Sequence, residues 1–341
     1  MRTESNAGNI VKPVLFLLAG LIMVGVAWWL TRPDPVKEKT QRQRQEFFVL
    51  TGSQLLNQEE QRNREAVERA RRQIEANFAR YRTGVPQFAE SLTTWGTRYE
   101  MTKAALSDWW SKTNEARDVA TNQFANFVVS DKKLRDDITL VIAQFSSDLV
   151  ANRNGMLSEL GEKISAAALP CASADLGSAN PSAAFLLEAQ PLIKNKAVMS
   201  PLIGVLAMSG GFFATEVVVA RIVPKLLVAM ATRLATGAAA RGSLVAASAL
   251  AAGGTGTAVG PMGTAIGVGV GLLAGILIES WIDKRYEAKV TNELNQMLTD
   301  MEESLWNDPN QGLASSFAQA VKTTRDCHET VLRKIITGDE K

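Results

Sequence analysis

Apolar residues recur every three or four positions through most of the polar part of the chain. The first clear example lies in residues 55–81, where charged Glu and Arg fill the opposite side and Gly84 and Pro86 follow. A spacing of 3.6 residues places such positions on one face of a helix. The pattern therefore predicts an amphipathic helix with coiled-coil character, whose apolar face is formed by Val67, Ala70, Ile74, Phe78 and Tyr81.

The same spacing predicts two further long helices. One is expected over residues 88–127 and the other over residues 134–164, and neither range alternates as a strand would. Helices of this length with short connections pack as elongated antiparallel bundles. The predicted inward residues are Phe88, Leu92, Trp95, Tyr99, Leu106, Trp109, Ala116, Phe124 and Phe127 in the first, and Ile138, Val141, Phe145, Leu149, Met156, Leu157 and Leu160 in the second.

The C-terminal part repeats the pattern on both sides of a break at residues 307–312. Asn, Asp, Pro and Gly in that break are typical of a turn between helices. We expect the two segments to form a helical hairpin that packs on the rest of the chain. Their apolar faces are Val290, Leu294, Met297, Met301 and Leu305, followed by Leu313, Phe317, Val321, Thr324, Val331 and Ile335.

Residues 13–31 have a different character, because they are apolar and contain no charged side chain. About 20 such residues cross a bilayer as a helix. Trp28 and Trp29 stand at one end, where aromatic side chains prefer the membrane–water interface. No A-x-A cleavage site follows, so we expect an uncleaved transmembrane anchor.

A second apolar run covers residues 242–278, which contain no Lys, Arg, Asp, Glu or His. Within it four glycines recur every four residues and form one stripe of a helix, a pattern typical of close helix packing in membranes. We expect one crossing at 261–281 or a hairpin over 243–281. The stripe consists of Gly263, Gly267, Gly271 and Gly275, and Trp281, Lys284 and Arg285 mark the membrane interface.

These patterns predict an all-α membrane protein with an N-terminal transmembrane anchor, an elongated helical or coiled-coil region, a glycine-zipper segment or hairpin and a C-terminal helical hairpin. The predicted divisions are a tail (1–12), the anchor (13–31), the amphipathic helical domain (32–167), a linker (168–200), amphipathic and membrane-associated helices (201–241), the glycine-zipper segment (242–281) and the C-terminal helical tail (282–341).

The flanking charges indicate an orientation. Arg2 and Lys12 precede the anchor, whereas five basic residues follow it within about 15 positions. Basic flanks favour the cytoplasmic side, so we expect a bacterial inner-membrane protein with most of its mass in the cytoplasm. The alternative places residues 32–240 outside and the C-terminal tail inside.

Candidate chemistry is sparse. His328 is the only histidine, and its neighbours Asp326, Cys327 and Glu329 point in different directions on a helix. We expect a solvated histidine, and no catalytic, cofactor-binding or metal-binding residue. Arg side chains at 62–80 alternate with Glu59, Glu60, Glu65, Glu68 and Glu75, which predicts a solvated or coiled-coil face. The net charge of +2 argues against nucleic acid as a partner.

The sequence favours two functions over a third, a membrane enzyme or transporter subunit, for which it offers one histidine and no motif. One is a non-enzymatic, membrane-anchored scaffold that forms homo-oligomers through the glycine helix and contacts the lipid bilayer, with residues 40–165 available to a protein partner. The other is a pore-forming or membrane-remodelling protein that uses residues 242–281. That apolar segment inside an amphipathic helical chain resembles the membrane hairpin of pore-forming colicins, which implies insertion into a bilayer.

Overall fold

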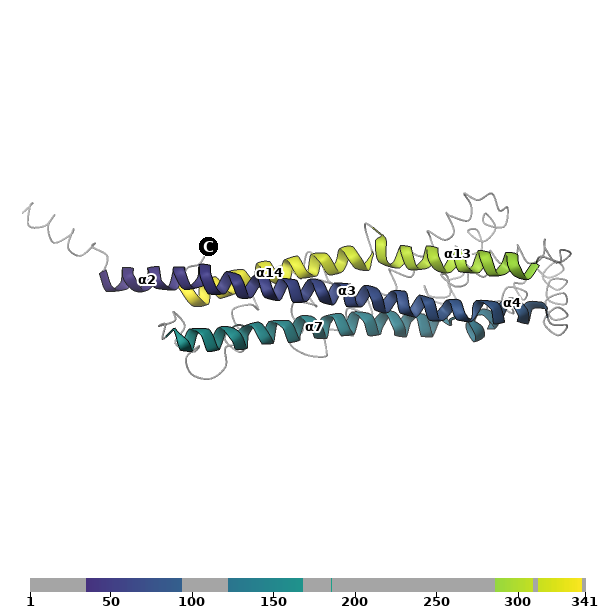
Figure 1. Cartoon of the computed structure of the whole chain (residues 1–341), viewed down its shortest axis with the longest axis horizontal. Helices are drawn as coiled ribbons and strands as arrows, with labels where there is room; N and C mark the ends of the chain where they lie inside the picture. The colour runs from purple at the N-terminus through teal and green to yellow at the C-terminus, as the bar shows by residue number, and fades with distance from the viewer. Residues whose placement is uncertain (1–34, 94–121, 168–184, 186–285, 309–311, 339–341) are drawn as a thin grey trace, which may run out of the picture.

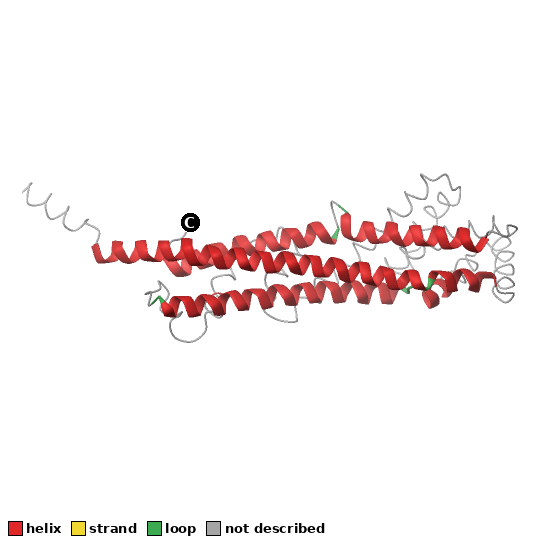
Figure 2. Cartoon of the chain, in the orientation of Figure 1, coloured by secondary structure: helices red, strands yellow, loops and turns green. Residues whose placement is uncertain are grey.

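The computed structural model describes residues 35–93, 122–167, 185, 286–308 and 312–338. Over these residues the chain is helical and contains no strand, as the sequence predicts (Figure 2). The long helices lie side by side and form a rod (Figure 1). Helices α2 (Pro35–Phe47), α3 (Ser53–Thr83), α4 (Val85–Thr93), α7 (Asp131–Ala166), α13 (Tyr286–Asn307) and α14 (Leu313–Thr337) follow one another in the chain.

Within the described ranges, no helix combines the length and apolarity that crossing a bilayer requires. The predicted anchor at 13–31 and the predicted glycine-zipper segment at 242–281 lie outside those ranges. The linker at 168–200, apart from Phe185, and the segment at 201–241 lie outside them as well.

The first part of the rod is one helical path from Pro35 to Thr83. A π-helical turn, η1 (Phe48–Gly52), joins α2 to α3, and its neighbours Phe47 and Ser53 keep right-handed helical backbone angles. The extra residue of a π turn rotates the side chains that follow it. Phe48 is buried here, whereas Val49 and Leu50 are 64% and 73% exposed.

Helix α3 has the apolar face that the sequence predicts. Ala70, Ile74, Phe78 and Tyr81 are buried, and Val67 packs partly buried against the same core. The helix ends at Gly84, as expected. A Cβ at Gly84 would overlap the carbonyl oxygen of Phe127, so only glycine lets these two backbones approach so closely.

The predicted single helix over residues 88–127 is wrong. The rings of Phe88 and Phe124 lie 5.7 Å apart, edge to face. One straight helix would separate these residues by about 54 Å at 1.5 Å per residue. Periodicity reports which face of each turn is apolar, but it does not report whether the chain keeps its direction.

Helix α7 confirms the third prediction. The Ser130 hydroxyl accepts a hydrogen bond from the backbone N–H of Lys133 at 3.2 Å and so caps the first turn. Every predicted inward residue of this helix is buried, namely Ile138, Val141, Phe145, Leu149, Met156, Leu157 and Leu160.

Helices α13 and α14 have the predicted apolar faces but do not form the predicted hairpin. Figure 1 shows them end to end along the rod, running opposite to α3. Arg82 pairs with Glu302 of α13, whereas Gln41 donates to the carbonyl oxygen of Thr337 at the end of α14. The hairpin prediction is wrong because other helices cover the two apolar faces. Helices α2 and α3 lie along α14, and the end of α3 together with α4 lies along α13.

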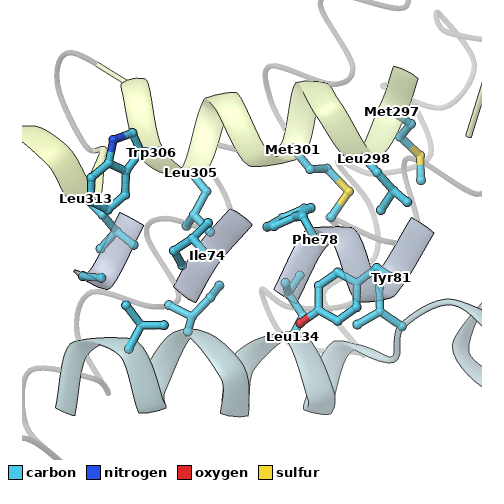
Figure 3. Close-up of a cluster of buried hydrophobic side chains, with 14 of the residues drawn as sticks. Ile74, Phe78, Tyr81, Leu134, Met297, Leu298, Met301, Leu305, Trp306 and Leu313 are labelled. Atoms are coloured by element: carbon cyan, nitrogen blue, oxygen red, sulfur yellow. The ribbon is translucent and has the colours of Figure 1, made fainter. Parts of the chain in front are cut away.

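Two hydrophobic clusters fill the rod. The larger one joins α3, α4, α7, α13 and the first half of α14 (Figure 3), and in it the rings of Phe145 and Phe317 stack at 4.1 Å. The smaller one joins η1 and the start of α3 to the ends of α7 and α14, with Phe185. Between the two clusters the interior is polar.

Candidate functional site

The polar interior forms one layer across the rod, to which each long helix contributes an ionisable side chain. Glu59 comes from α3, Arg153 from α7 and His328 from α14, and their exposed fractions are 2%, 7% and 6%. Leu56 and Ala66 flank this layer on α3, and each belongs to a different hydrophobic cluster. The layer therefore interrupts an otherwise continuous apolar core.

Glu59 and His328 are directly bonded. The imidazole Nδ1 lies 2.8 Å from the Glu59 Oε2 atom, and 269 positions separate the two residues in the sequence. The ring of Phe185 packs edge-on against the imidazole, with centroids 4.9 Å apart. The other carboxylate oxygen, Oε1, is buried and has no hydrogen-bond partner among the described residues.

Arg153 adds a cation to this layer. Burial lowers the pKa of its guanidinium, while the charge of Glu59 acts in the opposite direction. The guanidinium also donates to the side-chain oxygen of Asn154 at 3.3 Å. Next to this group, the Asn152 amide donates to the side-chain oxygen of buried Asn63 at 2.9 Å. The layer thus balances a buried carboxylate with polar and cationic groups from the other two helices.

The contacts of this layer bear on how the helices align. A buried polar contact is satisfied in only one register, because sliding a helix would leave charges unpaired in the core. The contact between Glu59 and His328 therefore fits a single register of α3 against α14. The two side chains are also an acid–base pair, and neither lines the surface grooves along α3.

A row of ion pairs on the surface of α3 repeats this alignment. Arg62 pairs with Glu159, Arg69 with Asp148 and Arg80 with Asp137, so residue numbers rise on α3 as they fall on α7. On the other side Arg325 of α14 pairs with Glu60. Each exposed pair contributes little stability by itself, but all of them agree with one antiparallel register.

Asp137 is the most densely bonded acid of this row. Its Oδ2 atom accepts from the Tyr81 hydroxyl at 2.6 Å and from Arg80 at 2.7 Å, and Lys133 lies 3.0 Å from Oδ1. Burial opposes its ionisation, but these hydrogen bonds and positive charges outweigh that effect and lower its pKa. Burial and the neighbouring Asp137 raise the pKa of Tyr81, so Tyr81 stays a donor.

Two grooves run along α3. The one between α3 and α14 has a volume of about 890 Å³ and is lined mainly by charged side chains, including Glu65, Arg72 and Lys322. The one between α3 and α7 measures about 600 Å³ and includes Leu140, which is 59% exposed. Among the described residues no three His, Cys, Asp or Glu side chains are grouped as a metal ion would require.

The membrane residues predicted from the sequence lie outside the described ranges, whereas the predicted charged face of α3 lies within them. The glycine stripe Gly263, Gly267, Gly271 and Gly275 lies outside the described residues, as do the interface residues Trp28, Trp29, Trp281, Lys284 and Arg285. The solvated face of α3 is confirmed at Glu65, Glu68 and Glu75, which are exposed, and Glu60 is partly exposed.

Two expectations about single residues are wrong. His328 is buried rather than solvated, and Glu59 belongs to the core rather than to the charged face. A signal for both was present in the sequence. His328 follows Thr324 by four residues and precedes Val331 by three. Glu59 stands eleven residues before Ala70, which is three helical turns, so both lie on predicted apolar stripes.

In comparisons with known proteins, no family model matches this chain, and no curated protein or solved structure is significantly similar to it.

Proposed function

We propose that this chain is a membrane-anchored helical scaffold that self-associates through its glycine-striped segment. The observation that carries the proposal is the rod itself, in which three long helical stretches are held in one register by a buried polar layer and by interhelical ion pairs. A rigid rod holds its two ends at a fixed separation, which is the mechanical property of a scaffold or spacer.

Its attachment to the membrane is the second part of the proposal. Residues 32–34 alone separate the predicted anchor at 13–31 from helix α2, so the start of the rod is held close to the bilayer. The basic residues after the anchor favour the cytoplasmic side of a bacterial inner membrane for the rod. In this role the chain tethers and assembles, and it carries out no chemical step.

Self-association is proposed from the glycine stripe. A stripe of small residues lets two membrane helices approach backbone to backbone. Replacing Gly267 and Gly271 with Leu would fill that stripe with side chains. Gly269 lies about 200° around the helix from Gly267, so Gly269→Leu makes the same change on the opposite face.

The test measures oligomer mass for the full chain in lipid nanodiscs or native gels. We expect Gly267→Leu combined with Gly271→Leu to reduce the oligomer to smaller species, and Gly269→Leu to leave it unchanged. An unchanged mass for the double variant would contradict the glycine-stripe proposal. Release of the full chain from membranes by alkaline carbonate would contradict membrane integration.

The same preparation separates the scaffold from the pore-forming alternative. A scaffold leaves dye-loaded liposomes sealed, whereas a pore empties them. We expect no leakage above that of protein-free liposomes at protein-to-lipid ratios where the chain is fully bound. Leakage that depends on residues 242–281 would replace the scaffold proposal with the pore.

A further inference from the structure

The two predicted membrane segments join the rod at opposite ends. Residues 32–34 connect the anchor at 13–31 to α2, and residues 282–285 connect the predicted hairpin at 243–281 to α13. A hairpin is required here, because α7 before it and α13 after it belong to the same rod. Figure 1 shows α2 at one end of the rod and the start of α13 at the other. The antiparallel contacts require the starts of α2 and α13 to lie at opposite ends, because Arg82 pairs with Glu302 while Gln41 contacts Thr337.

The separation of these two points follows from helix geometry. At 1.5 Å per residue the path from Pro35 to Arg82 covers about 70 Å. Glu302 lies beside Arg82, and from Glu302 back to Tyr286 α13 extends about 24 Å farther in the same direction. The two junctions are therefore roughly 95 Å apart along the rod.

The connecting residues are too few to bridge such a distance. An extended chain covers at most about 3.6 Å per residue, so residues 32–34 span about 11 Å and residues 282–285 about 14 Å. If the rod stood upright on the anchor, the uncharged run of 242–278 would be held far from that bilayer, in water. Both segments reach one bilayer only if the rod tilts by no more than about 10° from the membrane plane.

The charges place both ends on the same side. Basic residues follow the anchor, among them Arg32, Lys37 and Lys39, and Lys284 and Arg285 follow the second segment. The positive-inside rule favours the cytoplasmic side for both flanks. We propose that the rod lies flat along the cytoplasmic surface of a single bilayer, which holds it at two points roughly 95 Å apart. This inference rests on the proposed function, because it requires that both segments enter the membrane.

Three exposed positions on α7 allow the orientation to be measured. Asp136, Ser147 and Ser165 are all exposed. At 100° per residue they lie within about 20° of one another around the helix, and they span about 43 Å along it. Each is changed to Cys in a Cys171→Ser full-length chain and labelled with a donor fluorophore. The parent without an added Cys measures any labelling of Cys327, which is 3% exposed.

The measurement is energy transfer from each donor to acceptor-labelled lipids in proteoliposomes. We expect clear transfer at Asp136→Cys, Ser147→Cys and Ser165→Cys, because a rod tilted by no more than about 10° holds all three within about 8 Å of one height. Transfer that falls to background at one end of α7 would overturn the proposal, since it indicates an upright rod. Absence of transfer at all three positions would overturn it as well.

A second variant tests whether the predicted hairpin at 243–281 holds the far end. Leu272→Arg with Leu273→Arg opposes insertion of this segment, and Leu272→Ile with Leu273→Ile is the matched control. We expect the Arg variant to lose transfer at Asp136→Cys while Ser165→Cys, nearer the anchor, keeps it. Unchanged transfer at both positions would overturn the proposal. If alkaline carbonate releases the unmodified chain, the proposed membrane attachment has failed instead.

Discussion

The buried pair of Glu59 and His328 gives the sharpest test of how the rod is held together. The two side chains are 2% and 8% exposed, and 2.8 Å separates Oε2 from Nδ1. In His328→Leu the Glu59 carboxylate would lose its only described hydrogen bond while remaining buried. Leaving a buried charge without its partner costs about 3–5 kcal/mol. In Glu59→Leu the buried Arg153 guanidinium loses the carboxylate charge that acts on it, and His328 loses its hydrogen-bond partner, so we expect a cost of similar size.

The loss of stability in the double variant should be smaller than the sum of the losses in the two single variants. With Leu at both positions neither the carboxylate nor the imidazole is orphaned, but the buried Arg153 cation still lacks the Glu59 charge. The second substitution therefore adds little to the cost of Glu59→Leu. We expect the double variant to be no less stable than Glu59→Leu alone, with a coupling free energy of at least about 2 kcal/mol.

The assay is urea unfolding of the full chain in a mild detergent, followed by far-ultraviolet circular dichroism and extrapolated linearly to water. The matched control is the pair of Arg71 and Glu75, whose side chains are 52% and 48% exposed at 2.9 Å. Ala substitutions there should give a coupling of about 0.3–0.5 kcal/mol. A coupling for Glu59 and His328 as small as that of the control would refute the argument that the buried layer aligns the helices.

Three further predictions follow from the packing and charges. Gly84→Ala should destabilise the chain by about 1–3 kcal/mol, because the added Cβ meets the Phe127 backbone. Gly155→Ala should stabilise the chain by about 0.5–1 kcal/mol, because its Cβ would have only an Arg62 nitrogen nearby, at 3.6 Å. Equal urea midpoints for the two variants would contradict this prediction. Phe145→Ala should lower the stability by about 3–5 kcal/mol, because Phe145 is buried. Leu140→Ala should lower it by less than about 0.5 kcal/mol, because Leu140 is exposed. Differential scanning calorimetry measures both effects, and a larger loss for Leu140→Ala would contradict the assignment of the core. Asp137 has a lowered pKa in the folded chain, so its contribution to stability is complete above the ordinary carboxyl pKa and is lost as pH falls below about 4. Asp137→Asn should therefore lower the urea midpoint at pH 7 and make that midpoint depend less on pH in acid. Parallel pH profiles for the variant and the unmodified chain would exclude a stabilising role of the Asp137 charge.

Much of the local structure could be predicted from the sequence. The apolar faces of α3, α7, α13 and α14 follow from a 3.6-residue period, which depends only on neighbouring residues. Gly84 and the break at 307–312 were recognisable as helix ends for the same reason, since glycine, proline and asparagine act on the backbone locally. The position of each helix and the side of it that is apolar can be predicted without knowing which other helix packs against it.

The pairing of the helices was decided only by the tertiary structure. An apolar face does not identify its partner. The sequence therefore predicts that α13 and α14 cover each other, whereas α2 and α3 cover α14, and α3 and α4 cover α13. The contact of Phe88 with Phe124 has the same origin, because periodicity carries no information about the direction of the chain.

The burial of single charged residues is likewise a tertiary property. Glu59 and His328 lie on apolar stripes, but a charge enters a core only where a complementary group meets it. That group comes from a helix 269 positions away in the chain, and its distance of 2.8 Å is set by how the whole rod packs. The sequence therefore determined the helices and their faces, whereas the tertiary structure decided their partners, because pairing depends on contacts between residues that are remote in the chain.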